Sequence, residues 1–117
     1  MIISDIDVPN YPLEKSEYSF DITVKNLGPD KCCEIYQNTE FSKDGNFLGG
    51  LAFHATYECW VNPDGNGILP DQSATSSTGL FNFNETGSYT VKSNIKCLLP
   101  GEGNIDNGVF ETSVQIK

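Results

Sequence analysis

His54 is the single histidine of this sequence, and most familiar active sites would depend on such a residue. Nucleophilic catalysis by serine or cysteine needs a histidine beside the nucleophile, and a blue-copper site needs two. The residues around His54 alternate, with Phe53 and Ala55 on the apolar side, so His54 belongs to the opposite face of a strand. We therefore expect a surface histidine, no catalytic residues and no enzyme activity.

The cysteines form the second set of residues with chemical potential: Cys32, Cys33, Cys59 and Cys97. They include no CxxC pair of the kind that structural zinc sites favour, so we expect disulfides formed in an oxidising compartment. Adjacent Cys32 and Cys33 would point to opposite faces of a strand, and their pairing stays open. Cys59 and Cys97 each lie on the apolar parity of a strand. A Cys59–Cys97 bridge is therefore the first expectation.

A loop between two apolar runs places oxygen-bearing side chains at alternate positions, namely Asn62, Asp64 and Asn66. This pattern resembles the start of a calcium loop, but Ser73 stands where a bidentate glutamate would complete the site. Pro-Asp-Gly and Asn-Gly are also ordinary turn sequences. We expect a turn and no cofactor, with calcium as the alternative.

The charge balance is strongly acidic, with 16 Asp and Glu residues against seven lysines, no arginine and a net charge of −9. This balance excludes nucleic-acid binding, because a phosphate backbone attracts Lys and Arg clusters. No stretch approaches the roughly 20 apolar residues of a membrane span, so we expect no membrane insertion. The start MIISDIDVPN lacks the segments of a signal peptide. If the protein is secreted, the chain is a mature product or a domain excised from a longer protein, and its abrupt start inside an expected strand favours excision. Asn84-Glu85-Thr86 is a glycosylation sequon, which matters only on a glycosylating secretory route.

Alternation with a period of two runs through the chain and indicates half-buried β-strands. Clear examples are residues 18–24 and 89–97, and turn sequences such as Lys43-Asp44-Gly45-Asn46 separate such runs. A change of parity near Gly79 indicates a β-bulge in an edge strand. At the start of the chain, the alternation puts Ile2 and Ile6 on one face.

About seven or eight short strands, with turns roughly every ten residues, predict an all-β fold. We expect residues 1–117 to form a single immunoglobulin-like sandwich of two antiparallel sheets, because alternating faces are best buried by packing one sheet on another. Tyr89 follows Gly87 and should bond back to the backbone as a corner tyrosine does. The expected core consists of Phe20, Ile22, Val24, Tyr89, Val91, Ile95, Phe110 and Val114.

The order of these pieces resembles a known family. Val24-Lys-Asn-Leu-Gly28 ends an early strand, Leu69-Pro-Asp-Gln-Ser73 leads to Phe83, and Gly87-Ser-Tyr89 opens the next strand. Together they resemble the CARDB-type (cell-adhesion-related) immunoglobulin-like domains of bacterial and archaeal surface proteins. The resemblance spans most of the chain. It implies an extracellular, non-enzymatic module that spaces or presents other domains.

The leading hypothesis is therefore a structural or adhesive module at the cell surface or outside the cell. Its expected partners are neighbouring domains of a parent protein or other surface proteins. The alternative is a ligand-binding module that recognises carbohydrate or calcium through the loops at residues 62–67 and 100–108.

Overall fold

The computed structural model describes residues 2–28, 31–56, 67–99 and 103–117, and within them it contains nine strands and no helix. The described residues therefore include no helix that could cross a membrane. The strands are β1 (Ile2–Ile6), β2 (Ser16–Tyr18), β3 (Asp21–Lys25), β4 (Glu34–Lys43), β5 (Asn46–Thr56), β6 (Ser73–Ser77), β7 (Phe81–Phe83), β8 (Gly87–Leu99) and β9 (Gly103–Ile116).

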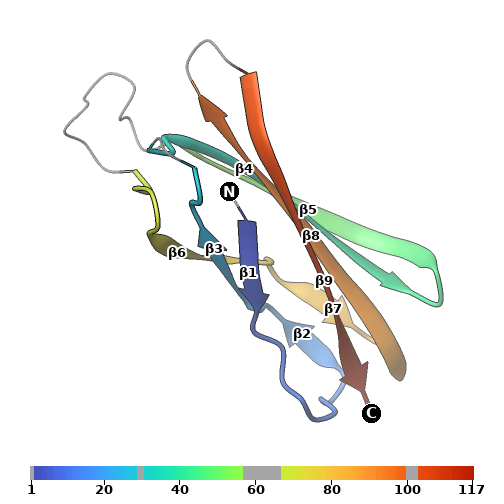
Figure 1. Cartoon of the computed structure of the whole chain (residues 1–117). Coiled ribbons are helices and arrows are strands. Elements are labelled where there is room, and N and C mark those ends of the chain that lie inside the picture. The colour runs from blue at the N-terminus through green and yellow to red at the C-terminus, as the bar shows by residue number, and fades with distance from the viewer. Residues whose placement is uncertain (1, 29–30, 57–66, 100–102) are drawn as a thin grey trace.

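The strands form the layers of a sandwich (Figure 1). One sheet has four strands in the order β5-β4-β8-β9, the other has three in the order β1-β3-β6, and β2 pairs with β7. Every strand pair is antiparallel. The end strand β1 contacts β8 and β9, which leaves β6 on the side of β4 and β5. The expected immunoglobulin-like sandwich is confirmed.

The hairpin between β4 and β5 forms where the turn sequence predicts it. Asp44 and Gly45 both have positive φ, at 53° and 79°. A two-residue hairpin loop of type I′ has positive φ at both positions, which matches the twist of its strands, and Asp-Gly adopts this conformation at little steric cost. The turn sets the first two pairs of the hairpin, and a bulge at Leu48 then shifts the register by one residue for the rest of β5.

The parity change near Gly79 is a bulge, as expected, and it explains why there are nine strands. Tyr18 pairs with Phe81 and Asp21 pairs with Ser77. Between these two pairs, the chain advances three residues from Tyr18 to Asp21 but four residues from Ser77 to Phe81, so the second segment has one extra residue. The extra residue divides each of two expected strands, giving β2 and β3 on one side and β6 and β7 on the other. Within the gap, the buried Thr78 hydroxyl accepts a hydrogen bond from the Phe20 amide at 3.0 Å.

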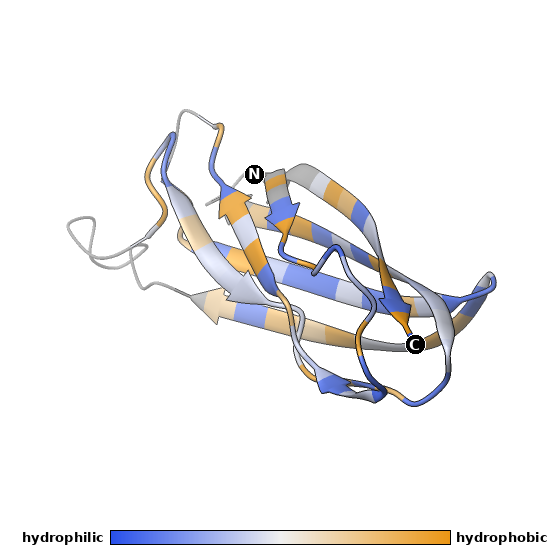
Figure 2. Cartoon of the chain, turned by 90° about the horizontal axis from the view of Figure 1, so that it is seen from below, coloured by the Kyte–Doolittle hydropathy of each residue, from blue (hydrophilic) through white to orange (hydrophobic). Residues whose placement is uncertain are grey.

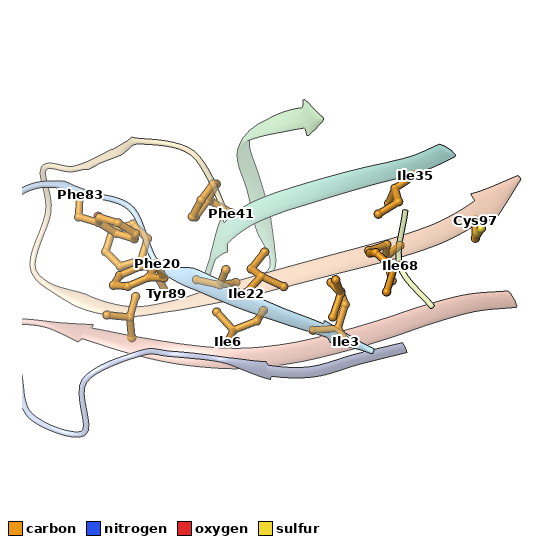
Figure 3. Packing of buried hydrophobic residues seen from close by; sticks show 14 of the residues in the cluster. Ile3, Ile6, Phe20, Ile22, Ile35, Phe41, Ile68, Phe83, Tyr89 and Cys97 are labelled. Carbon is orange, nitrogen blue, oxygen red and sulfur yellow. The ribbon is translucent and has the colours of Figure 1, made fainter. Parts of the chain in front are cut away.

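The core lies between the sheets and is built from the inward parity of each strand (Figure 3). Seven of the eight expected core residues are buried, and Phe110 is partly buried against them. Phe20, Phe83 and Tyr89 gather at one end, where the Phe83 and Tyr89 rings meet edge to face at 5.0 Å. Ile35 and Ile68 fill the other end. Figure 2 shows the alternating hydrophobic and hydrophilic bands that produce this burial.

The expected parity of the first strand is wrong. Ile3 and Ile6 are both buried, although alternation alone would put them on opposite faces. The register against β3 shifts between Ile3 and Asp5, where two steps along β1 face one along β3. This irregularity turns both isoleucines toward the core.

The disulfide pairing also differs from the expectation. Cys97 bonds to Cys32, with an S–S distance of 2.10 Å and Cα atoms 6.0 Å apart, so the expected Cys59–Cys97 bridge is wrong. Parity shows which face a cysteine occupies, whereas the neighbour depends on strand order: β4 pairs with β8 and places Ile35 opposite Cys97, close to Cys32.

Cys33 also belongs to a disulfide, no described cysteine has a free thiol, and Cys59 lies outside the described residues. Disulfides persist in oxidising compartments. The Cys32–Cys97 bond therefore indicates a protein that works outside the cytoplasm.

Candidate functional site

The outer face of the four-stranded sheet carries a compact group of side chains, here called the outer-face cluster: Glu34, Tyr36, His54 and Lys96. Along β4, inward residues are buried and the alternate residues are partly buried or exposed, so Glu34 and Tyr36 lie on the outer face. The register then places Tyr36 opposite His54 on β5 and opposite Lys96 on β8. Three strands thus supply one cluster.

Tyr36 stands between two cross-strand neighbours. The His54 ring lies parallel to it, with centroids 4.2 Å apart and planes 3° apart. On the β8 neighbour, the Lys96 Nζ lies 5.5 Å from the Tyr36 centroid, within the range of a cation–π interaction. Glu34 joins the group, because its Oε1 lies 2.7 Å from His54 Nε2 and accepts the Tyr36 hydroxyl at 3.3 Å. These contacts hold the side chains in one arrangement.

The electrostatics suit a recognition surface. Desolvation raises the pKa of the Tyr36 phenol above 10.0, and the charge of Glu34 and its hydrogen bond raise that pKa further. Tyr36 therefore stays a neutral hydrogen-bond donor through the neutral and mildly basic range. The His54 side chain is 46% exposed and that of Glu34 is 22% exposed, so the contact between them adds little to stability. The charged groups remain accessible to a ligand.

A second set of residues, here called the amide row, lies next to the cluster along the strands: Asn38, Ala52 and Asn94. Asn38 pairs with Ala52 on β5 and with Asn94 on β8, and all three are exposed. Three members of the cluster (Tyr36, His54 and Lys96) and the amide row border a depression of about 500 Å³, which Gln37 and Phe53 also line. Two amides beside stacked rings offer donors and acceptors to a polar ligand in this depression.

The residues expected to do chemistry are placed as follows. His54 is an exposed strand residue, as expected. Asn62, Asp64 and Asn66 lie outside the described residues. Within the described part of the chain, no three His, Cys, Asp or Glu side chains come together as a metal site. Asn84, in the sequon, is an exposed residue between β7 and β8.

The Tyr89 corner is confirmed. The Tyr89 hydroxyl donates to the Glu85 carbonyl at 3.0 Å and accepts from the Glu85 amide at 3.1 Å. The ring itself is 1% exposed and sits in the aromatic end of the core. Both contacts are to backbone, so Tyr89 stabilises the entry into β8.

The sequence alone did not single out Tyr36, Asn38, Asn94 or Lys96. Each falls on the polar parity of its strand, which is the only signal in the pattern. Their proximity depends on the pairing of β4 with β8, across more than fifty residues of chain, and on its register. Polar parity marks all four as surface residues, but only the pairing makes them neighbours.

Neither a protein-family model nor a curated protein matches the chain. Among solved structures, the chain is similar to Bacteroides uniformis β-glucuronidase 2, with a TM-score of 0.58 and 12% identity over 95% of the chain. It is also similar to the C-terminal domain of Wzt, with a TM-score of 0.53 and 12% identity over 91% of the chain. The chain spans 12% of the glucuronidase chain and 63% of the Wzt chain. At this identity the similarity shows the β-sandwich fold alone.

Proposed function

We propose that this chain is a non-enzymatic structural or adhesive module of an extracellular or cell-surface protein, which spaces or presents neighbouring domains. The outer-face cluster is the observation that supports this role most directly. It presents a tyrosine, a histidine and charged groups on a sheet, held by mutual contacts. Protein recognition surfaces favour such anchors, because ordered side chains lose little conformational entropy on binding.

Three further observations agree with this role. The buried Cys32–Cys97 disulfide suits an oxidising, extracellular setting. The domain is elongated, with principal extents of 48 × 22 × 19 Å, and its C-terminus lies at one end of the long direction (Figure 1). Such a shape suits a module placed in series with others. The resemblance to CARDB-type domains through residues 24–28 and 69–89 points to the same setting.

A labelling experiment on intact source cells tests the location. An antibody raised against the folded chain should stain cells without permeabilisation, or detect the protein in the medium. Staining that appears only after permeabilisation would contradict a surface role.

A bead-binding experiment tests the adhesive role. Beads coated with the folded chain should bind intact source cells, and Tyr36→Ala should reduce the binding. Thr75→Ala, an exposed position on β6 in the other sheet, is the matched control and should bind like the unmodified chain. Equal binding by all three proteins would remove the outer-face cluster from the proposal.

A second candidate function, carbohydrate binding, is favoured by the amide row. Asn38 and Asn94 lie side by side and exposed, and an amide can donate and accept at neighbouring hydroxyl groups of a sugar. The adjoining Tyr36 and His54 rings add an apolar edge to the same depression. This candidate places the ligand on the sheet face, whereas the end loops first expected to bind it lie partly outside the described residues.

A glycan array followed by NMR titration tests this candidate. Any glycan that binds should shift the amide signals of β4 and β8, and Asn38→Ala with Asn94→Ala should weaken binding by at least about tenfold. Thr75→Ala again serves as the control on the opposite sheet. Shifts confined to the end loops would place the ligand there and overturn the sheet-face site.

A further inference from the structure

Strand β5 is an end strand of the four-stranded sheet, and it differs from the other end strands in its combination of length and lack of charge. It is 11 residues long and contains no Asp, Glu, Lys or Arg, with His54 as its one ionisable side chain. The opposite end strand, β9, carries Glu111, and the end strand β1 carries Asp5. Proteins usually protect exposed edges with charges, prolines, short strands or β-bulges, because an edge presents backbone N–H and C=O groups to other chains. β5 has a bulge at Leu48, so its regular edge runs from Gly49 to Thr56. The other uncharged end strands, β6 and β7, have five and three residues.

Exposed apolar side chains concentrate on this strand. Four of the nine large apolar residues that are exposed in the described part of the chain lie on β5, namely Phe47, Leu48, Leu51 and Phe53. Leu51 and Phe53 have the inward parity, yet they are 41% and 46% exposed. The reason is that the four-stranded sheet extends past its three-stranded partner, and an open groove of about 550 Å³ lies between β5 and β6.

We propose that β5 pairs antiparallel with β5 of a second copy of this chain. The pairing would give the outer edge of each β5 a partner strand and join the two four-stranded sheets into one. Leu51 and Phe53 of each copy would then lie beside the same residues of the other on the inner side. This interaction surface goes beyond the proposed adhesive role and does not depend on it.

The absence of Asp, Glu, Lys and Arg on β5 allows a second copy to approach at this edge. Two chains that each carry a net charge of −9 repel over most of their surface. β5 is a long end strand without Asp or Glu, so two copies can approach along it without bringing carboxylates of this strand together. An antiparallel pair about a two-fold axis also makes a strand its own complement, so one surface serves both partners.

The dimer has a functional consequence. A two-fold axis perpendicular to the joined sheet keeps both outer faces on the same side. Each dimer would therefore present two outer-face clusters on one surface, and a ligand with repeated features could engage both.

Sedimentation equilibrium of the intact chain, from micromolar to near-millimolar concentration, tests the proposal. The unmodified chain should move from 12.8 kDa toward twice that mass as concentration rises. Leu48→Lys and Leu51→Lys each add a charge to the edge and should raise the dissociation constant by more than about tenfold. Val109→Lys is the matched control, because Val109 is 57% exposed on β9 at the other edge, and it should dimerise like the unmodified chain.

A second measurement covers the case in which a lysine variant fails to fold. Hydrogen exchange of β5 amides in the unmodified chain should slow as concentration rises, while exchange at β9 stays constant. A chain that remains monomeric throughout, or a dimer that Val109→Lys breaks and both β5 variants spare, would overturn the proposal.

Discussion

Removal of the Cys32–Cys97 disulfide should cost the domain a large part of its stability. The variant is Cys32→Ala with Cys97→Ala, since a single substitution would leave a reactive thiol. The two cysteines are 65 residues apart, so the bond removes about 15 cal/mol/K of entropy from the unfolded chain, equivalent to about 4 kcal/mol at 25 °C. The free energy of unfolding of a native domain is about 5–15 kcal/mol, so the variant should be marginally stable.

Guanidinium chloride unfolding, followed by fluorescence and circular dichroism, measures this effect. The midpoint should fall, and the dependence of unfolding free energy on denaturant should steepen, because the chain without this cross-link exposes more surface when unfolded. Val24→Ala is a suitable control, since Val24 is 1% exposed and its truncation removes packing without changing any cross-link. It should lower the midpoint and leave the slope unchanged.

A loss of stability below about 1 kcal/mol with an unchanged slope would contradict this prediction, because the cross-link would then constrain the unfolded chain little. Free thiols at both positions in oxidised, folded protein would refute the pairing itself. Peptide mapping under non-reducing conditions tests the pairing and should recover a linked peptide that contains Cys32 and Cys97.

Three other predictions concern single side chains. Tyr89→Phe should lower the free energy of unfolding by about 1–3 kcal/mol, because it removes both hydrogen bonds to the Glu85 backbone, and a thermal midpoint equal to that of the unmodified chain would contradict this. Phe83→Ala should cost about 3–5 kcal/mol in denaturant unfolding, since Phe83 is fully buried, and a loss near zero would mean that the aromatic end packs differently. NMR titration should give Tyr36 a pKa above 10.0, and Glu34→Gln should lower it, unless Glu34 has no part in the shift. The folded chain holds this proton more tightly, so the stability that the shift contributes is present below pH 10 and is lost as pH rises through the folded pKa.

Much of the fold was predictable because its signals are local. Alternation identified the strands that carry Ile22 and Val91, and Asp44-Gly45 marked a hairpin whose positive φ values the structure shows. The parity change near Gly79 marked a bulge, and the Gly-Ser-Tyr89 sequence marked a corner. Each feature arises from steric and hydrogen-bonding demands within a few residues, so a few residues suffice to reveal it.

The candidate site was largely unpredictable because it arises from pairing between distant strands. Tyr36, His54 and Lys96 are polar-parity residues of three strands, and no local pattern distinguishes them from other surface positions. A shift of one residue in the pairing of β4 with β8 would turn Lys96 away from Tyr36. The disulfide was misassigned for the same physical reason, since the order of the strands, which no local pattern reveals, places Cys97 beside Cys32.

Two kinds of interaction, local and long-range along the chain, therefore decide different features of this protein. Backbone sterics and side-chain alternation, which act over neighbouring residues, decide that the chain forms strands and turns and which side of each strand is apolar. Sheet order, register and the unequal width of the two sheets arise from contacts between residues far apart in the chain. These long-range contacts assemble the outer-face cluster, select the Cys32–Cys97 bond and leave β5 exposed at an edge.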